Sequence, residues 1–138
     1  MEITANAPQT VTSGQAVLFT ETPISGNCAI LHREGSRLTK LRGFTNGQCR
    51  ARFRVTFGGN IAAATTAAAI SLALTIDGEP VNTSSMIVTP AATDEFFNVS
   101  TSLFLDIPKD CCSTVAVRNT STQSIIIQNA NLIIERVA

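Results

Sequence analysis

The chain has 138 residues, the size of one domain, and can bury a core without help from a disulfide or a metal. Charged residues make up 14% of it, against about 25% in an average protein, so we expect self-association to hide part of the surface. The formal net charge is zero, which argues against nucleic acid and anionic membranes as partners.

Turn residues recur at roughly even intervals along the chain, and the runs between them resemble strands. Such spacing is typical of a β-sandwich or barrel rather than of alternating strands and helices. Ten strands are predicted, over residues 15–20, 28–33, 38–42, 48–57, 69–76, 85–89, 96–107, 114–119, 124–128 and 131–137. We therefore expect residues 1–138 to form a single all-β domain.

The fourth run alternates strictly between apolar and polar residues. Its apolar positions are Cys49, Ala51, Phe53, Val55 and Phe57, and its polar positions are Arg50, Arg52, Arg54 and Thr56. Because successive side chains of a strand point to opposite faces, this strand has one buried face and one solvated face. The arginine row could bind phosphate or a sulfated sugar, since guanidinium groups suit such anions. Pairing with acids of neighbouring strands is the alternative that we favour.

Residues 61–70 are rich in alanine and could be read in two ways. Alanine favours a helix, but ten residues are few for an isolated helix. We expect a connection of small residues that leads into the next strand, with a short helical turn as the alternative.

Three runs are apolar on both faces, at residues 103–105, 125–127 and 132–134, and 29–31 is a weaker fourth. A strand that is apolar on both faces is covered on both faces, whereas a two-layer sandwich covers only one. A second subunit is the expected cover, and a loop folded over the sheet is the alternative. The interface residues predicted from these runs are Ile30, Phe104, Ile126 and Ile133.

The residues that could carry chemistry are few. His32 is the only histidine, so it would be the sole base for a nucleophile, and we interpret it as an ordinary strand residue. Asp106 and Asp110, or Asp77 and Glu79, could contribute to a calcium site, but calcium needs six to eight oxygens and neither pair lies in a recognisable loop. We expect no catalytic residue, no metal site and no cofactor.

The four cysteines are expected to be reduced, because the N-terminus has no secretion signal. Cys28 and Cys49 are predicted to be buried as small hydrophobic residues. Cys111 and Cys112 are adjacent and lack the spacing of metal ligands.

Ten short strands, the arginine-alternating fourth strand and the two-sided last strand resemble the trimeric jelly roll of the tumour necrosis factor and complement globular-head superfamily. Residues 20–28, 49–53 and 127–137 resemble small proteins of gut Firmicutes and their phages. The resemblance implies a compact, ten-stranded jelly-roll sandwich that forms a homotrimer, with the inner sheets packed about a threefold axis.

The same resemblance implies a non-enzymatic structural protein on a phage virion surface, either a capsid decoration or a head fibre. Such a protein would be made in the bacterial cytoplasm without a signal peptide. Its partners would be other copies of itself and a capsid or other virion protein, with no nucleic acid and no membrane. The alternative is a trimeric recognition module that binds a host glycan or protein through its outer loops.

Overall fold

The computed structural model describes all 138 residues and contains twelve strands, one short 3-10 helix and no α-helix. The elements are β1 (Glu2–Ala5), β2 (Gln9–Val11), β3 (Glu21–Ile24), β4 (Ile30–His32), β5 (Thr39–Arg42), β6 (Arg50–Ala63), β7 (Ile70–Ile76), β8 (Glu79–Pro80), η1 (Asn82–Ser84), β9 (Met86–Val88), β10 (Phe97–Pro108), β11 (Cys112–Asn119) and β12 (Ile125–Arg136). The all-β prediction is confirmed, and the count of ten strands is corrected to twelve.

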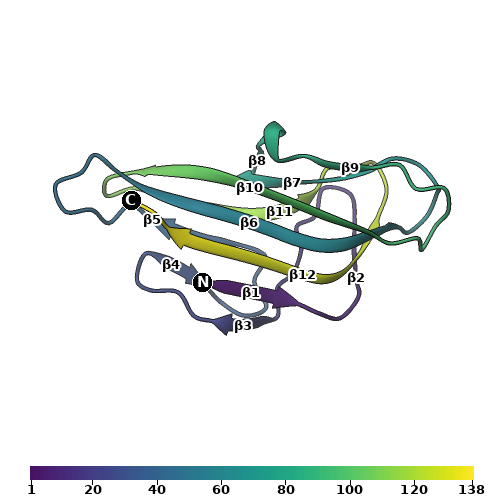
Figure 1. Ribbon diagram of the computed structural model, residues 1–138, viewed down its shortest axis with the longest axis horizontal. Helices are drawn as coiled ribbons and strands as arrows, with labels where there is room; N and C mark the ends of the chain where they lie inside the picture. Colours follow the sequence, from purple (N-terminus) through teal and green to yellow (C-terminus); the bar gives the residue numbers. More distant parts are fainter.

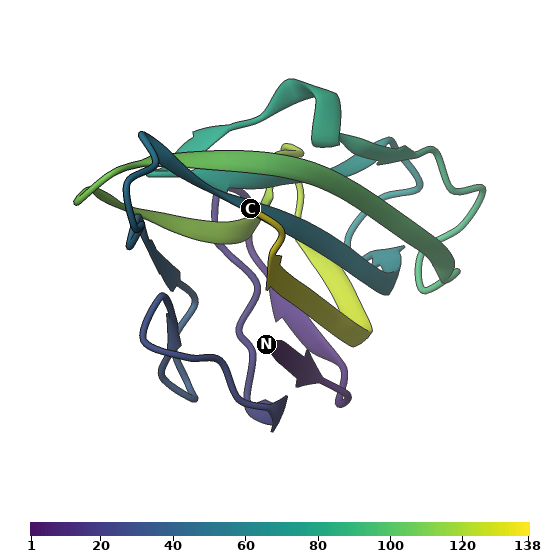
Figure 2. The ribbon, with the colours of Figure 1, turned by 60° about the vertical axis from the view of Figure 1, so that its left-hand side comes forward.

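The strands form two antiparallel sheets that lie face to face (Figures 1 and 2). One sheet has the order β10-β6-β12-β1-β3, with β2 also paired to β12, and the other has the order β4-β5-β11-β7-β8, with β9 also paired to β7. The two ends of the chain meet in the first sheet, where β1 pairs with β12 in both views.

The core lies between the sheets and consists of 26 buried residues. The strand β6 supplies its centre, because Ala51, Phe53, Val55 and Phe57 are all fully buried there. On β10 the residues Val99, Leu103 and Leu105, which point to one side of the strand, pack against the same core. The period-2 pattern identified the buried face of β6 correctly.

Several strand boundaries differ from the prediction, mainly near the N-terminus. Residues 15–20 form no strand and make only an isolated bridge from Ala16 to Arg118. The strands β1, β2, β3 and β8 were not predicted; each has only two to four residues, too few for a periodic pattern to be recognised.

The last two predicted strands are a single strand, β12, because a β-bulge replaces the expected turn. The pairing of β12 with β6 shifts between Gln128 and Asn131, and Asn129 adopts a left-handed backbone with φ of 54°. Opposite this bulge β6 passes through Gly58 and Gly59 without a turn. A Cβ on Gly59 would lie 3.3 Å from the Cζ of Phe57 and 3.4 Å from the Cα of Ala130, so there is little free space beside this residue.

The alanine-rich segment contains no helix. Ile61, Ala62 and Ala63 extend β6 and are fully buried, while residues 64–69 form the connection to β7. The prediction of a small-residue connection is therefore correct only for the second part of the segment. Burial in the sheet outweighs the intrinsic helical preference of alanine here.

The prediction that Cys28 and Cys49 are buried is wrong. All four cysteines are free and exposed. Cys49 lies one residue before β6, and Cys28 precedes β4 in a turn, so neither is inside the part of the sandwich that encloses the core. Alternation along the sequence does not reveal where the second sheet ends.

Replacing all four cysteines by serine should leave stability almost unchanged, because substitutions at exposed positions change the free energy of unfolding by only about 0.5 kcal/mol or less. Thermal melting of this variant, and of the unmodified protein with reductant or with a strong chelator, measures the effect. A fall in melting temperature of more than about 10 °C would contradict this prediction, since a loss of ~1 kcal/mol lowers the melting temperature of a domain of this size by only a few degrees.

No helix of the structure has the length and apolar character needed to span a membrane.

Candidate functional site

The sheet that contains β6 has a second face, directed away from the core, which we call the outer face. Strand register places Phe104 opposite Arg54, Ile133 opposite Thr56 and Ile126 opposite Ala62. Paired residues of neighbouring strands point to the same side of a sheet, so three of the four predicted interface residues share this face.

The fourth predicted interface residue, Ile30, belongs elsewhere. It is only 4% exposed and packs in the core of its own chain, on the other sheet. Its side chain therefore cannot contact a second subunit. The run 29–31 is apolar on both faces because Ala29 and Ile30 are both buried as the chain enters β4, while Leu31 is exposed.

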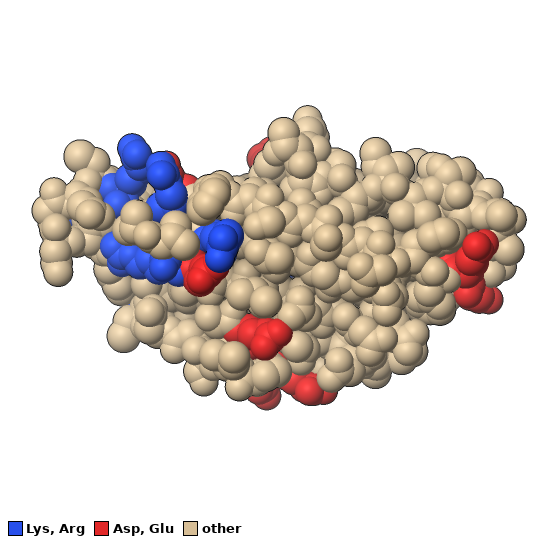
Figure 3. Space-filling model, in the orientation of Figure 1, with Lys and Arg blue, Asp and Glu red and all other residues tan.

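The three arginines of the predicted anion-binding row all lie on the outer face, and each pairs with a carboxylate (Figure 3). Arg50 Nε lies 3.1 Å from Asp106 Oδ2, and Arg52 donates to both oxygens of the same carboxylate at 2.8 and 3.1 Å. Arg54 donates to Glu135. Cross-strand pairing, the alternative favoured from the sequence, is what the structure contains.

The pairing also shifts the pKa values of two groups on this face. The hydrogen bonds from Arg52 hold the pKa of the Asp106 carboxyl below its ordinary value, and the same contact raises the pKa of the Arg52 guanidinium. With Asp106 shared between Arg50 and Arg52, the row is largely neutralised and is a poor site for a free anion.

Uncharged polar side chains on the outer face are also paired with one another. Thr56 and Ser102 hydroxyls lie 3.1 Å apart, Asn98 donates to Asn60 at 3.1 Å, and Asn131 donates to Glu2 at 2.6 Å. Between these pairs, Phe104 is 64% exposed and Ile133 is 38% exposed. The face thus combines apolar side chains with polar groups that already have partners.

A second feature lies at the end of the sandwich where the chain terminates, beside the β5–β6 loop and the β10–β11 turn (Figure 1). We call it the basic end, formed by Lys40, Arg42, Phe44, Asp110 and Arg136. On the face shown in Figure 3, cations gather at the same end of the molecule, where β6 begins with the paired arginines Arg50, Arg52 and Arg54. Lys40 and Arg42 belong to β5 of the other sheet.

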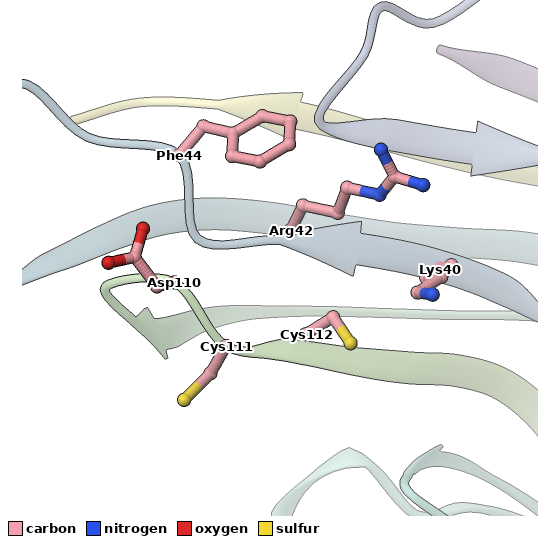
Figure 4. A pocket seen from close by; sticks show the side chains of 6 residues that line it. All are labelled: Lys40, Arg42, Phe44, Asp110, Cys111 and Cys112. Atoms are coloured by element: carbon pink, nitrogen blue, oxygen red, sulfur yellow. The ribbon is translucent and has the colours of Figure 1, made fainter.

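The basic end contains two hollows that meet at one loop. The first, of about 270 Å³, is lined by Lys40, Arg42, Phe44, Asp110, Cys111 and Cys112 (Figure 4). The second, of about 560 Å³, is lined by Phe44, Thr45, Asn46, Asp110 and Arg136. Phe44 and Asp110 line both hollows, so the two lie next to each other at these side chains.

The remaining residues weighed from the sequence do not form a reactive site. His32 Nδ1 lies 3.1 Å from Thr39 Oγ1, and its ring packs edge-on against Phe19. Asp106 is held by arginines and so is not poised for calcium with Asp110. No group of three or more His, Cys, Asp or Glu side chains is arranged to hold a metal ion.

No protein-family model and no curated protein sequence matches this chain. Among solved structures, the globular domain of zebrafish complement 1qA protein is similar to it, with a TM-score of 0.61 and 12% identity over 96% of this chain and 93% of that one. The chain therefore has the jelly-roll fold of a complement globular domain. At this level of identity the similarity shows the fold alone.

Two sugar-binding structures are more distant. The C-terminal domain of EclA, a sugar-binding protein, has a TM-score of 0.44 and 14% identity over 95% of this chain and 79% of that one. A family 35 carbohydrate-binding module from Clostridium thermocellum has a TM-score of 0.36 and 10% identity over 92% of this chain and 98% of that one. Similarity this weak carries no argument about function.

The sequence did not reveal the basic end as a site. Lys40 and Arg42 alternate with buried residues on β5, a pattern typical of any solvated strand face. Asp110 and Arg136 reach the same place only through the meeting of the β10–β11 turn with the β5–β6 loop. The only signal in the sequence was Phe44, an aromatic residue within a loop of turn-forming residues.

Proposed function

We propose that the chain is a non-enzymatic structural protein that forms a homotrimer through the outer face and decorates a phage virion, as a capsid decoration or head fibre. Its further partner would be a capsid or other virion protein. The observation that carries the proposal is the chemistry of the outer face, where the exposed apolar side chains of Phe104 and Ile133 lie among polar and charged groups that are paired with one another.

The outer face suits burial against copies of itself. Burying a polar group without a partner is costly, but the arginines, Thr56, Asn60 and Asn131 already have partners within the chain. Covering Phe104 and Ile133 then contributes favourable apolar burial with few polar groups left unsatisfied. The jelly-roll fold agrees with this arrangement, and the virion setting is supported by the resemblance of the sequence to phage proteins.

Asp106→Asn should weaken the trimer. It removes the carboxylate shared by Arg50 and Arg52 and would leave two arginines without a partner in the interface, where an unpaired charge is costly to bury. Mass photometry over a dilution series should show the variant dissociating at a concentration at least tenfold higher than the unmodified protein. Asp94→Asn, which changes the net charge equally in a connection before β10, is the matched control. Equal dissociation of both variants would contradict the interface.

Acid should act on the same contact. Since the pKa of Asp106 is lowered in the folded chain, its contribution is fully present above the ordinary carboxyl value of about 3.9 and is lost as the pH falls through the lower folded value. The ion pairs with Arg50 and Arg52 should thus persist at pH 4 and be lost only in stronger acid. The chemical shifts of the Asp106 side chain, followed during an acid titration, show the pH at which its carboxylate is protonated.

Electron microscopy of particles of a phage that encodes the chain tests the virion role. The expected result is a regular array of trimeric density on the capsid, which disappears in particles that carry Ile133→Asp. Absence of the chain from the particles would overturn the proposal. Density confined to the tail tips would instead favour the recognition module.

The recognition module remains a second candidate because of one observation. The basic end presents two adjacent hollows, of about 270 and 560 Å³, beside cations that have no carboxylate partner. The larger volume is within the range of small-molecule sites, and the smaller lies just below it. A trimer that bound a ligand there and was absent from virions would support this candidate.

A further inference from the structure

The two hollows of the basic end are built by backbone contacts that hold their walls in place. Gly43 N–H donates to Cys111 O at 2.8 Å, and Asp110 N–H donates to Gly43 O at 3.1 Å, so the β10–β11 turn is bonded to the start of the β5–β6 loop. A Cβ on Gly43 would lie 2.1 Å from Pro108 O, so only glycine allows this approach.

The loop itself is also restrained. Thr45 Oγ1 donates to Gln48 O at 2.8 Å, and Arg136 Nη1 donates to the carbonyl of Phe44. The guanidinium of Arg42 lies 5.6 Å from the centre of the Phe44 ring, yet the ring is 46% exposed. Figure 4 shows Lys40 and Arg42 on the same strand, with Phe44 and Asp110 on the two connections beside it. The site is therefore organised before any ligand binds.

The charges at this end are not balanced as they are on the outer face. The ion pairs of the chain involve only Arg50, Arg52 and Arg54, so Lys40, Arg42 and Arg136 have no carboxylate within 4.0 Å. Asp110, which belongs to both hollows, is likewise not in an ion pair. Three cations and one carboxylate thus surround the two hollows.

We propose that the basic end binds an acidic saccharide, a sugar that carries one carboxylate on a ring with several hydroxyl groups. Its carboxylate binds Lys40 and Arg42 in the first hollow, where the guanidinium supplies charge-assisted hydrogen bonds. Its hydroxyl groups, or those of the next sugar, donate to Asp110 and bond to Asn46 and Thr45 in the second hollow. This site deepens the second candidate function and does not require the virion role.

Asp110 favours this ligand class over densely charged polyanions. A carboxylate accepts hydrogen bonds from hydroxyl groups but repels phosphate and sulfate. Because Asp110 lines both hollows, a nucleic acid or a highly sulfated chain could not lie across them without facing it. A saccharide with one charge per ring can place its carboxylate on the cations and its hydroxyl groups on Asp110.

Isothermal titration calorimetry of the full chain with trigalacturonic acid tests the proposal, with the trimethyl ester of the same sugar as the uncharged control. The acid should bind, and the affinity of the ester should be lower by a factor of about ten or more, because the ester cannot accept charge-assisted hydrogen bonds. Equal binding of the two, or no binding of the acid at millimolar concentration, would overturn the proposal. So would tighter binding of dextran sulfate or a short DNA duplex.

Variants locate the site. Arg42→Gln should lower the affinity for the acid about tenfold or more, as expected for loss of a charged hydrogen-bond donor. Arg118→Gln, which removes the same charge from β11 where Arg118 donates to Gly78 O, should leave the affinity unchanged. Asp110→Asn should weaken binding of the acid and strengthen that of dextran sulfate. Equal losses in Arg42→Gln and Arg118→Gln would contradict the location.

Light scattering on each sample gives its mass, which allows failure of the saccharide site to be distinguished from failure of the proposed trimer. A trimer that does not bind the acid overturns only the saccharide site. A monomer that binds it overturns the trimer and leaves the site intact.

Discussion

Ile133→Asp should convert the proposed trimer into monomers that remain folded. Ile133 is partly exposed on the outer face, whereas its neighbours Leu132 and Ile134 are buried in the core, so only position 133 is available to another subunit. An unpaired charge buried in an interface costs about 3–5 kcal/mol, and a trimer would bury three copies. Light scattering should give a single-chain mass for this variant, and circular dichroism should give an unchanged β spectrum.

Two further variants separate loss of assembly from loss of folding. Ile133 lies opposite Glu2 on β1, so an aspartate there also faces a like charge within its own chain. Ile133→Lys can pair with Glu2 and should dissociate the trimer without that repulsion. Ile87→Asp, at an exposed apolar position on β9 of the other sheet, should leave the trimer intact. A trimer that survives both substitutions at Ile133 would place the interface elsewhere.

Phe57→Ala should lower the free energy of unfolding by about 3–5 kcal/mol, the usual cost of removing a buried phenylalanine. Phe57 is fully buried on β6, where it is paired with Thr101 of β10 and Leu132 of β12. Since domains are stable by only about 5–15 kcal/mol, this is a large fraction of the total. Urea unfolding followed by circular dichroism measures the change.

Phe96→Ala is the control for this substitution. Phe96 precedes β10 and is substantially exposed, so its truncation should change the free energy of unfolding by about 0.5 kcal/mol or less. Similar losses in Phe57→Ala and Phe96→Ala would contradict the assignment of the core to the odd-numbered face of β6.

The long strands could be predicted from the sequence because their alternation follows directly from the geometry of a strand. Val55 and Phe57 are buried and Arg52 and Arg54 point outward, as the period of two requires. The same holds for the turn between β7 and β8, where the pair Asp77-Gly78 is a typical tight-turn dipeptide and both residues have positive φ. Local rules hold where a few adjacent residues decide the structure.

Features that depend on distant parts of the chain could not be predicted in this way. The burial of Ile30 and the exposure of Cys49 depend on where the second sheet begins and ends, not on their neighbours in sequence. The neutralisation of the arginine row required knowing that Asp106 and Glu135 lie opposite Arg52 and Arg54. The basic end likewise forms only where two turns meet.

We propose that the outer face joins three copies of the chain. The most direct test of this proposal is the mass of the purified protein in solution, measured by light scattering after size exclusion at micromolar concentration. We predict a single species with three times the 14.6 kDa mass of one chain. A species with the mass of one chain at that concentration would contradict the account.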